Sequence, residues 1–113
     1  MNEEELKEAQ ECLTFIEESM SCFHAVENVK DRLNKEGFIE LKEENKWSLV
    51  PKGKYYVTKN NSAIVAFKVG NGDVAEHGFK LVGAHTDSPG FRIKPNPDIV
   101  VENAYVKLNT EVY

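Results

Sequence analysis

The sequence has few cysteines, no long apolar run and no cluster of basic residues. Cys12 and Cys22 are its only cysteines, and their ten-residue separation in a helical region favours reduced thiols packed in or near a core over a disulfide or a metal-binding pair. No apolar run approaches the roughly 20 residues needed to span a bilayer. The acidic N-terminus also lacks the cationic and apolar regions of a secretory signal. We therefore expect a cytoplasmic protein without a membrane partner.

The charge balance argues against a nucleic-acid partner. The 113 residues contain 19 acidic and 14 basic side chains, for a net charge of −5, and the basic residues are scattered. An anionic polymer or membrane surface would be repelled by such a chain. The hydrophobic content of 41% and charged content of 29% are those of a soluble globular protein, and the length allows one domain or a piece of one.

The first third of the sequence predicts two helices. Apolar residues at steps of three and four place the first helix from about Glu3 to Met20, with Asn2 or the chain start as its cap. Ser21 is a suitable N-cap for the second helix. Gly37 favours its end, because glycine readily adopts the left-handed conformation. The buried face of this second helix is predicted to contain Val26, Val29 and Leu33.

The middle of the sequence predicts strands. Residues 55–58 and 63–69 are rich in β-forming residues, and the intervening residues 59–62 suit a hairpin turn. Residues 38–41 form a shorter strand-like piece. The run from Phe79 to His85 is almost continuously apolar between Leu81 and Ala84, which predicts a central strand covered on both faces.

Further strand patterns follow Pro89. Residues 92–94 alternate, residues 95–98 interrupt the pattern, and residues 99–101 resume it. Residues 105–113 alternate clearly between apolar and polar side chains. Because the sequence stops inside this strand pattern, we expect it to be a segment of a longer protein.

His85 and Asp87 are the strongest candidates for chemistry. His85 lies where the predicted buried strand leaves the sheet, and the carboxyl ends of strands are where open α/β sheets bind ligands. A neutral imidazole is a good zinc ligand. Asp87 is close enough to accept a hydrogen bond from the other ring nitrogen. From the residues alone, a surface or capping pair remains an alternative.

The other two histidines point less clearly to function. His24 is predicted in the first turn of the second helix, where a capping or buried hydrogen bond is the simpler interpretation and a place beside a catalytic cleft is the alternative. His77 lies in a loop containing glycine and aspartate, where we expect it to be exposed to solvent.

The motif at residues 83–89, Gly-Ala-His-Thr-Asp-Ser-Pro, resembles the first metal-site motif of the aspartyl-aminopeptidase family of zinc metalloaminopeptidases. Residues 21–26, 47–49, 53–60, 94–97 and 108–113 resemble other family segments, in order along nearly the whole chain. Two departures are Cys22, where the family usually has proline, and Gly90-Phe91 after the motif.

The resemblance implies an α/β fold with two N-terminal helices packed on a mixed β-sheet, the first part of a zinc-peptidase catalytic domain. Residues 1–94 would belong to that domain, and residues 95–113 would begin an inserted β-rich oligomerisation domain. It also implies a homo-oligomeric enzyme that cleaves N-terminal, acidic residues from peptides with two zinc ions per active site. His85 would ligate one zinc, and Asp87 would be the catalytic residue that orients the site. The remaining ligands would come later in a complete enzyme, so the site in this chain is incomplete.

Two other functions are compatible with the same residues. The chain could be a binding or assembly module that retains the fold without catalysis. A small independent hydrolase using His85 as general base is the third possibility, although the sequence shows no nucleophile paired with it. Whether the chain belongs to an aminopeptidase or is an assembly module, we expect the 113 residues alone to be inactive.

Overall fold

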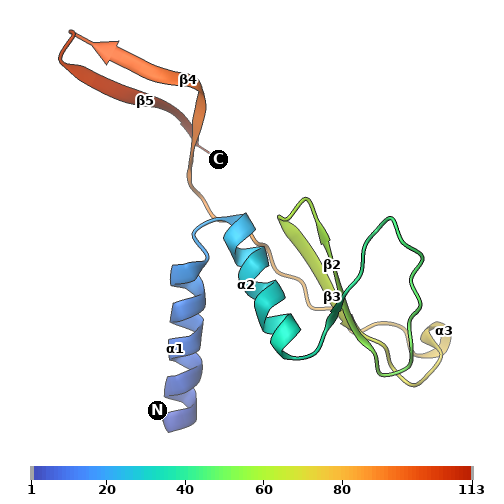
Figure 1. Ribbon diagram of the computed structural model, residues 1–113. Helices are drawn as coiled ribbons and strands as arrows, with labels where there is room; N and C mark the ends of the chain where they lie inside the picture. Colours follow the sequence, from blue (N-terminus) through green and yellow to red (C-terminus); the bar gives the residue numbers. More distant parts are fainter. Residues whose placement is uncertain (1, 113) are drawn as a thin grey trace.

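A computed structural model describes residues 2–112 (Figure 1). In chain order the elements are α1 (Glu3–Glu18), α2 (Cys22–Lys35), β1 (Ile39–Glu40), β2 (Lys54–Lys59), β3 (Ala63–Lys68), α3 (Val74–His77), β4 (Phe91–Val101) and β5 (Tyr105–Val112). The two long helices precede a three-stranded sheet of order β1-β2-β3, and β4 and β5 form a separate two-stranded sheet. The predicted α/β class, with two helices followed by a mixed sheet, is confirmed.

Helix α1 begins at the predicted cap and ends two residues before the predicted Met20. The Asn2 side chain accepts a hydrogen bond from the Glu5 N–H, and the Glu5 carboxylate accepts one from the Asn2 N–H. This reciprocal pair satisfies two N–H groups that the helix itself leaves without partners. Arg32 of α2 lies over the Phe15 ring, 4.8 Å from its centroid, and so joins the two helices.

Helix α2 supplies the helical part of the small core. Ser21 caps it as predicted, and its hydroxyl accepts a hydrogen bond from the His24 N–H. Val26 is 1% exposed and Ala25 is also buried, while Val29 and Leu33 are half-buried. Gly37 follows the helix with a φ of 77°, the left-handed conformation expected there.

Removing the Ser21 cap is expected to destabilise α2. Ser21→Ala leaves the His24 N–H without its side-chain acceptor, which costs about 1 kcal/mol of unfolding free energy. Chemical denaturation followed by circular dichroism measures this loss. Ser48→Ala, in an exposed loop, is the matched control. Equal stability of the two variants would contradict the assigned cap.

The three-stranded sheet contacts α2 through β3 and through a hydrogen bond from its central strand, β2. Strand β2 pairs in parallel with β1 and antiparallel with β3. Tyr55 and Tyr56 of β2 are buried, and the Tyr56 hydroxyl lies 3.0 Å from Asn34 Oδ1. Asn60 and Asn61 turn the chain with φ values of 50° and 54°, a conformation that asparagine tolerates better than most residues. The predicted hairpin is therefore confirmed.

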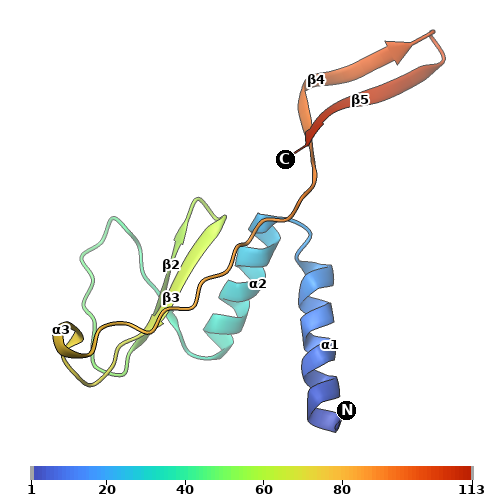
Figure 2. The same cartoon turned by 180° about the vertical axis from the view of Figure 1, so that it is seen from behind.

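The β4–β5 hairpin extends away from the helices and the three-stranded sheet (Figures 1 and 2). Its antiparallel register shifts between Ile93 and Asp98, at the segment whose sequence predicted a break. Asn96, in that segment, has a φ of 52°. The expected domain boundary between Lys94 and Pro95 falls inside β4.

The prediction of a covered central strand at residues 79–85 is wrong for this structure. The segment has no strand assignment, and Leu81 and Val82 are 90% and 96% exposed. A strand requires a neighbour to pair its main-chain groups, and within residues 2–112 none of the sheets includes this segment. The apolar side chains of this segment are suited to burial, but in this structure they are exposed to solvent.

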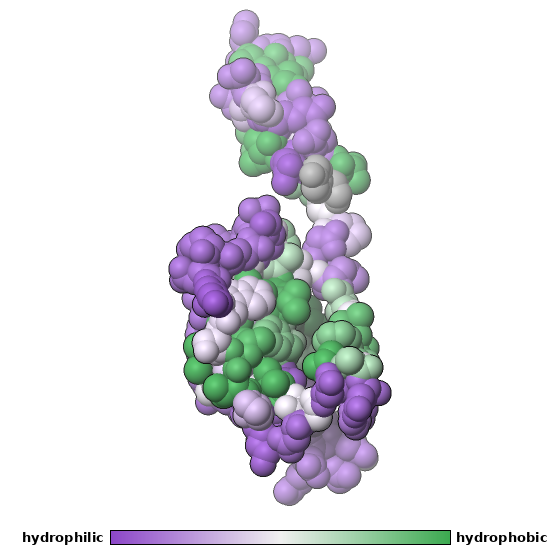
Figure 3. Space-filling model, turned by 90° about the vertical axis from the view of Figure 1, so that its right-hand side faces the viewer, coloured by the Kyte–Doolittle hydropathy of each residue, from purple (hydrophilic) through white to green (hydrophobic). Residues whose placement is uncertain are grey.

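Much other apolar surface is exposed as well. The accessible surface is 9876 Å², whereas a compact monomer of 12.8 kDa exposes roughly 6,300 Å². Figure 3 shows hydrophobic side chains gathered on the body below the hairpin, with hydrophilic side chains around them. Within residues 2–112 the helices are all too short or too polar to cross a membrane. Exposed apolar area of this size is typical of surfaces that bind other protein, a membrane or a ligand.

Candidate metal centre

His85 and Asp87 lie side by side in the loop that leads to the β4–β5 hairpin. The Nδ1 atom of His85 is 2.7 Å from the main-chain oxygen of Asp87 and 3.2 Å from its carboxylate oxygen Oδ1. Both side chains are 82% exposed. Solvent weakens the attraction between such exposed groups, so local chain geometry rather than charge holds this pair together.

The shorter contact determines which ring nitrogen of His85 carries the proton. A main-chain carbonyl oxygen can only accept a hydrogen bond, so Nδ1 must be the donor. In the neutral imidazole the other nitrogen, Nε2, then has a free lone pair. This is the tautomer that metal-binding histidines use when a carboxylate or carbonyl group holds their second nitrogen.

The segment around His85 borders an open groove of about 670 Å³. Apolar side chains of α1 and α2 line the groove, among them Phe15, Ile16 and Val29, together with Ile64 of β3. Residues 84–88 complete its lining. The candidate residues therefore adjoin a groove formed by the helices and the sheet, although the sequence did not reveal that α1 contributes to it.

One hydrogen bond joins this segment to the sheet. The Thr86 hydroxyl donates to the main-chain oxygen of Ser62, at a distance of 2.7 Å, from a position 24 residues away in sequence. Thr86 was not among the residues predicted to matter. A main-chain acceptor has no signature in the sequence, so only the three-dimensional structure reveals this contact.

The other histidines and the cysteines lie elsewhere. The His24 ring contacts Ser21 Oγ through Nδ1 at 2.8 Å, which agrees with the predicted role in local capping. His24 is not among the residues that line the groove. His77 is exposed at the end of α3, as predicted. Cys12 and Cys22 are free thiols, as predicted, but Cys12 is exposed rather than packed in or near a core.

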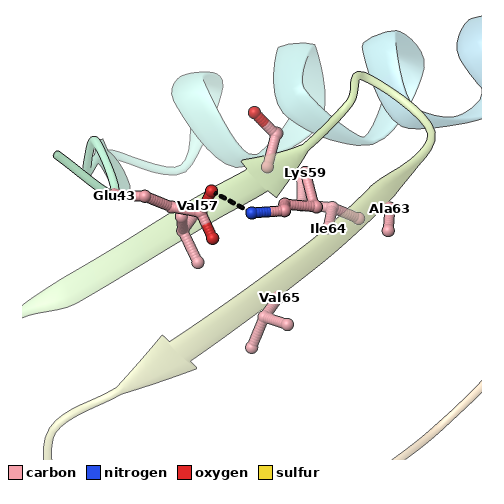
Figure 4. Close-up of a pocket in the computed structure, with 7 residues that line it drawn as sticks. Glu43, Val57, Lys59, Ala63, Ile64 and Val65 are labelled. Atoms are coloured by element: carbon pink, nitrogen blue, oxygen red, sulfur yellow. Dashed lines mark hydrogen bonds and ion pairs between the residues drawn. The ribbon is translucent and has the colours of Figure 1, made fainter.

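A second, smaller hollow has no comparable chemistry. It measures about 130 Å³ and lies over β2 and β3, lined by aliphatic residues with Glu43 and Lys59 (Figure 4). Glu43 and Lys59 form an ion pair at 2.7 Å, so each charge already has a partner. Neither histidine nor cysteine lines this hollow.

His85 fits a metal site as one ligand but not as a complete ligand set. Its Nε2 atom is available, and Asp87 holds the opposite side of the ring. A catalytic zinc site usually has three protein ligands. Within the described part of the chain, no cluster of three or more histidine, cysteine, aspartate or glutamate residues is placed to hold a metal ion.

Comparisons with known proteins agree with the motif. Residues 15–113 match the model of the aminopeptidase I zinc metalloprotease (M18) family. A probable M18 family aminopeptidase 2 of Clostridium novyi is 63% identical over 96% of this chain and 25% of its own length. An aspartyl aminopeptidase of Caenorhabditis elegans is 48% identical over 79% of this chain and 19% of its own length.

A solved structure extends the likeness to the fold. The S. cerevisiae mApe1 dodecamer superimposes with a TM-score of 0.83 and 28% identity, over 93% of this chain and 25% of its own. The chain thus spans about a quarter of the length of the relatives it matches. Because the family model covers most of the sequence, the resemblance inferred from the six stretches is confirmed: the chain belongs to the M18 family of aminopeptidase I zinc metalloproteases.

Proposed function

We propose that this chain is the N-terminal part of a two-metal zinc aminopeptidase that removes acidic residues from the N-termini of peptides. The observation that supports it best is the orientation of the His85 ring. Its Nδ1 atom contacts Asp87, so the Nε2 atom is free to bind a metal ion. Family membership supports zinc and peptide hydrolysis. The preference for acidic residues rests on the C. elegans relative, which is named an aspartyl aminopeptidase.

Each of the two residues has a separate role in this proposal. His85 supplies one ligand nitrogen. Asp87 fixes the ring orientation and its proton, and so keeps the lone pair on Nε2. Two bound zinc ions would polarise the scissile carbonyl group and make a bound water more acidic. We place the remaining ligands outside residues 2–112, because those residues contain no complete set.

The isolated chain is therefore expected to bind zinc weakly. One imidazole and a nearby carboxylate leave most coordination positions to water. Isothermal titration calorimetry should show no stoichiometric binding at nanomolar affinity, and His85→Ala should change the weak heats little. Tight binding by the native chain, lost in that variant, would show that residues 2–112 hold a complete site.

We also propose that residues 95–113 begin an oligomerisation domain of a cytoplasmic homo-oligomer. Two observations support this division. The β4–β5 hairpin lies apart from the helices and the three-stranded sheet (Figures 1 and 2), and a related structure is a dodecamer. The apolar side chains on the hairpin, including Phe91 and Val112 at 79% exposure each, suit burial against other protein.

A chimeric enzyme tests the catalytic proposal. The chain replaces the matching quarter of the Clostridium novyi relative, with which it is 63% identical. We expect the chimera to bind zinc and to hydrolyse peptides with N-terminal aspartate or glutamate faster than peptides with N-terminal leucine. A folded, zinc-loaded chimera without peptidase activity would contradict the proposed function.

The exposed apolar surface favours one other function, a non-catalytic assembly module. Such a module would use the groove and the hairpin to associate with a relative rather than to build a catalytic site. The same chimera separates the two functions. An assembly module predicts a chimera that reaches the oligomeric state of the relative and yet remains inactive.

A further inference from the structure

We propose that Thr86 is a positioning residue that fixes the metal-ligand segment to the β2–β3 turn. Its hydroxyl oxygen lies 2.7 Å from the main-chain oxygen of Ser62, and the hydroxyl must donate because a carbonyl oxygen only accepts. The inference rests on the proposed function in one respect, the role of the adjacent His85 as a zinc ligand.

The burial pattern shows that Thr86 differs from its neighbours in the sequence. From residue 70 to residue 93, all of which the structure describes, every residue except Thr86 is exposed. Thr86 is half-buried. Its neighbours His85 and Asp87 have side chains that are 82% exposed and bond mainly to each other. Within residues 84–88, Thr86 is thus the half-buried residue whose side chain is hydrogen-bonded to the β2–β3 hairpin.

The acceptor belongs to a well-defined turn. Ser62 follows Asn60 and Asn61, both with positive φ, and its N–H donates to the Lys59 main-chain oxygen at 3.1 Å. The strands on either side pair in continuous register from Lys54 with Lys68 to Lys59 with Ala63. A carbonyl group held by such a hairpin has a fixed direction, so its hydrogen bond can position a loop.

The consequence for the site follows from the order of the residues. Thr86 stands between His85 and Asp87, so the bond restrains the main chain that carries both. A loose segment would sample many ring positions, and binding a metal would then cost the entropy of ordering it. With the Thr86 hydrogen bond in place, the segment is ordered before the metal ion binds, and the His85 ring needs less rearrangement.

Nuclear magnetic resonance of the full 113-residue chain, free of metal, tests the inference. We expect backbone order parameters at residues 85–87 to lie nearer the rigid value of about 0.85 in the native chain, and to fall below about 0.6 in Thr86→Val. Thr86→Ser, which keeps the hydroxyl, should restore the order. The ring nitrogens of His85 should report one dominant Nδ1–H tautomer in the native chain and in Thr86→Ser, and a mixture in Thr86→Val.

Thr58→Val is the matched control, since it makes the same chemical change at a half-buried position of β2. It should leave residues 85–87 unchanged. The inference fails if Thr86→Val leaves both the order parameters and the tautomer unaltered, or if Thr86→Ser behaves like Thr86→Val. Because no metal is added, these results are independent of whether the chimera proves to be an active enzyme.

Discussion

Replacing His85 with alanine in the chimeric enzyme is expected to remove nearly all peptidase activity. In the proposed function the substitution deletes a zinc ligand, so it should cost more than the roughly 10–100-fold that follows loss of a residue that only orients a ligand. Zinc content per chain, measured by atomic emission, should fall in parallel with kcat. His77→Ala removes an exposed histidine from α3 and should leave both quantities unchanged.

Asp87→Asn is expected to reduce peptidase activity less than His85→Ala does. The Asp87 main-chain oxygen, which makes the shorter contact with His85 Nδ1, survives this substitution, and only the carboxylate contact at 3.2 Å is altered. We therefore expect a loss of activity of about 10-fold, at the lower end of the range for residues that orient metal ligands. A loss as large as that of His85→Ala would show that Asp87 acts on the metal or substrate directly.

Tyr56→Ala is expected to have the largest effect on stability. Tyr56 is 2% exposed, and its hydroxyl makes a hydrogen bond with Asn34, so the substitution removes both a buried ring and a link from β2 to α2. Truncating a buried aromatic side chain to alanine costs about 3–5 kcal/mol of unfolding free energy. Because the core contains few other buried side chains, we expect this loss to abolish the cooperative unfolding transition of the isolated chain.

Two further tyrosine variants separate the parts of that effect. Tyr56→Phe keeps the ring and removes the hydroxyl, which should cost about 1 kcal/mol. Tyr105→Ala truncates a tyrosine that is 66% exposed, so it should change stability by less than about 0.5 kcal/mol. Denaturant titrations followed by tryptophan fluorescence would report all three, since Trp47 packs near Phe67 beside β2. Equal losses in the Tyr56→Ala and Tyr105→Ala chains would contradict the location of the core.

The helices and the β2–β3 hairpin were predictable because local signals determine them. Ser21 and Gly37 mark the limits of α2 through main-chain hydrogen bonding and conformational freedom, which act over a few residues. The Asn60-Asn61 turn is specified in the same way. The contact between His85 and Asp87 was also predictable from sequence, since it spans only two positions, while their role at a metal stays a prediction.

Features that depend on distant residues were not predictable. The apolar residues 81–84 were expected to form a buried strand, yet burial requires neighbouring strands, and the sheets within residues 2–112 do not provide them. The contribution of Phe15 to the groove depends on how α1 packs against α2. The bond from Thr86 to Ser62 joins a side chain to a carbonyl group that every residue possesses.

The role of His85 can be tested most directly by locating zinc in crystals of the chimeric enzyme. An anomalous difference map recorded at the zinc absorption edge should place a metal ion about 2.0–2.1 Å from His85 Nε2, with Nδ1 still directed at Asp87. A zinc ion bound through Nδ1, or a fully occupied pair of zinc ions with His85 outside their coordination, would contradict the assignment of this histidine as a metal ligand.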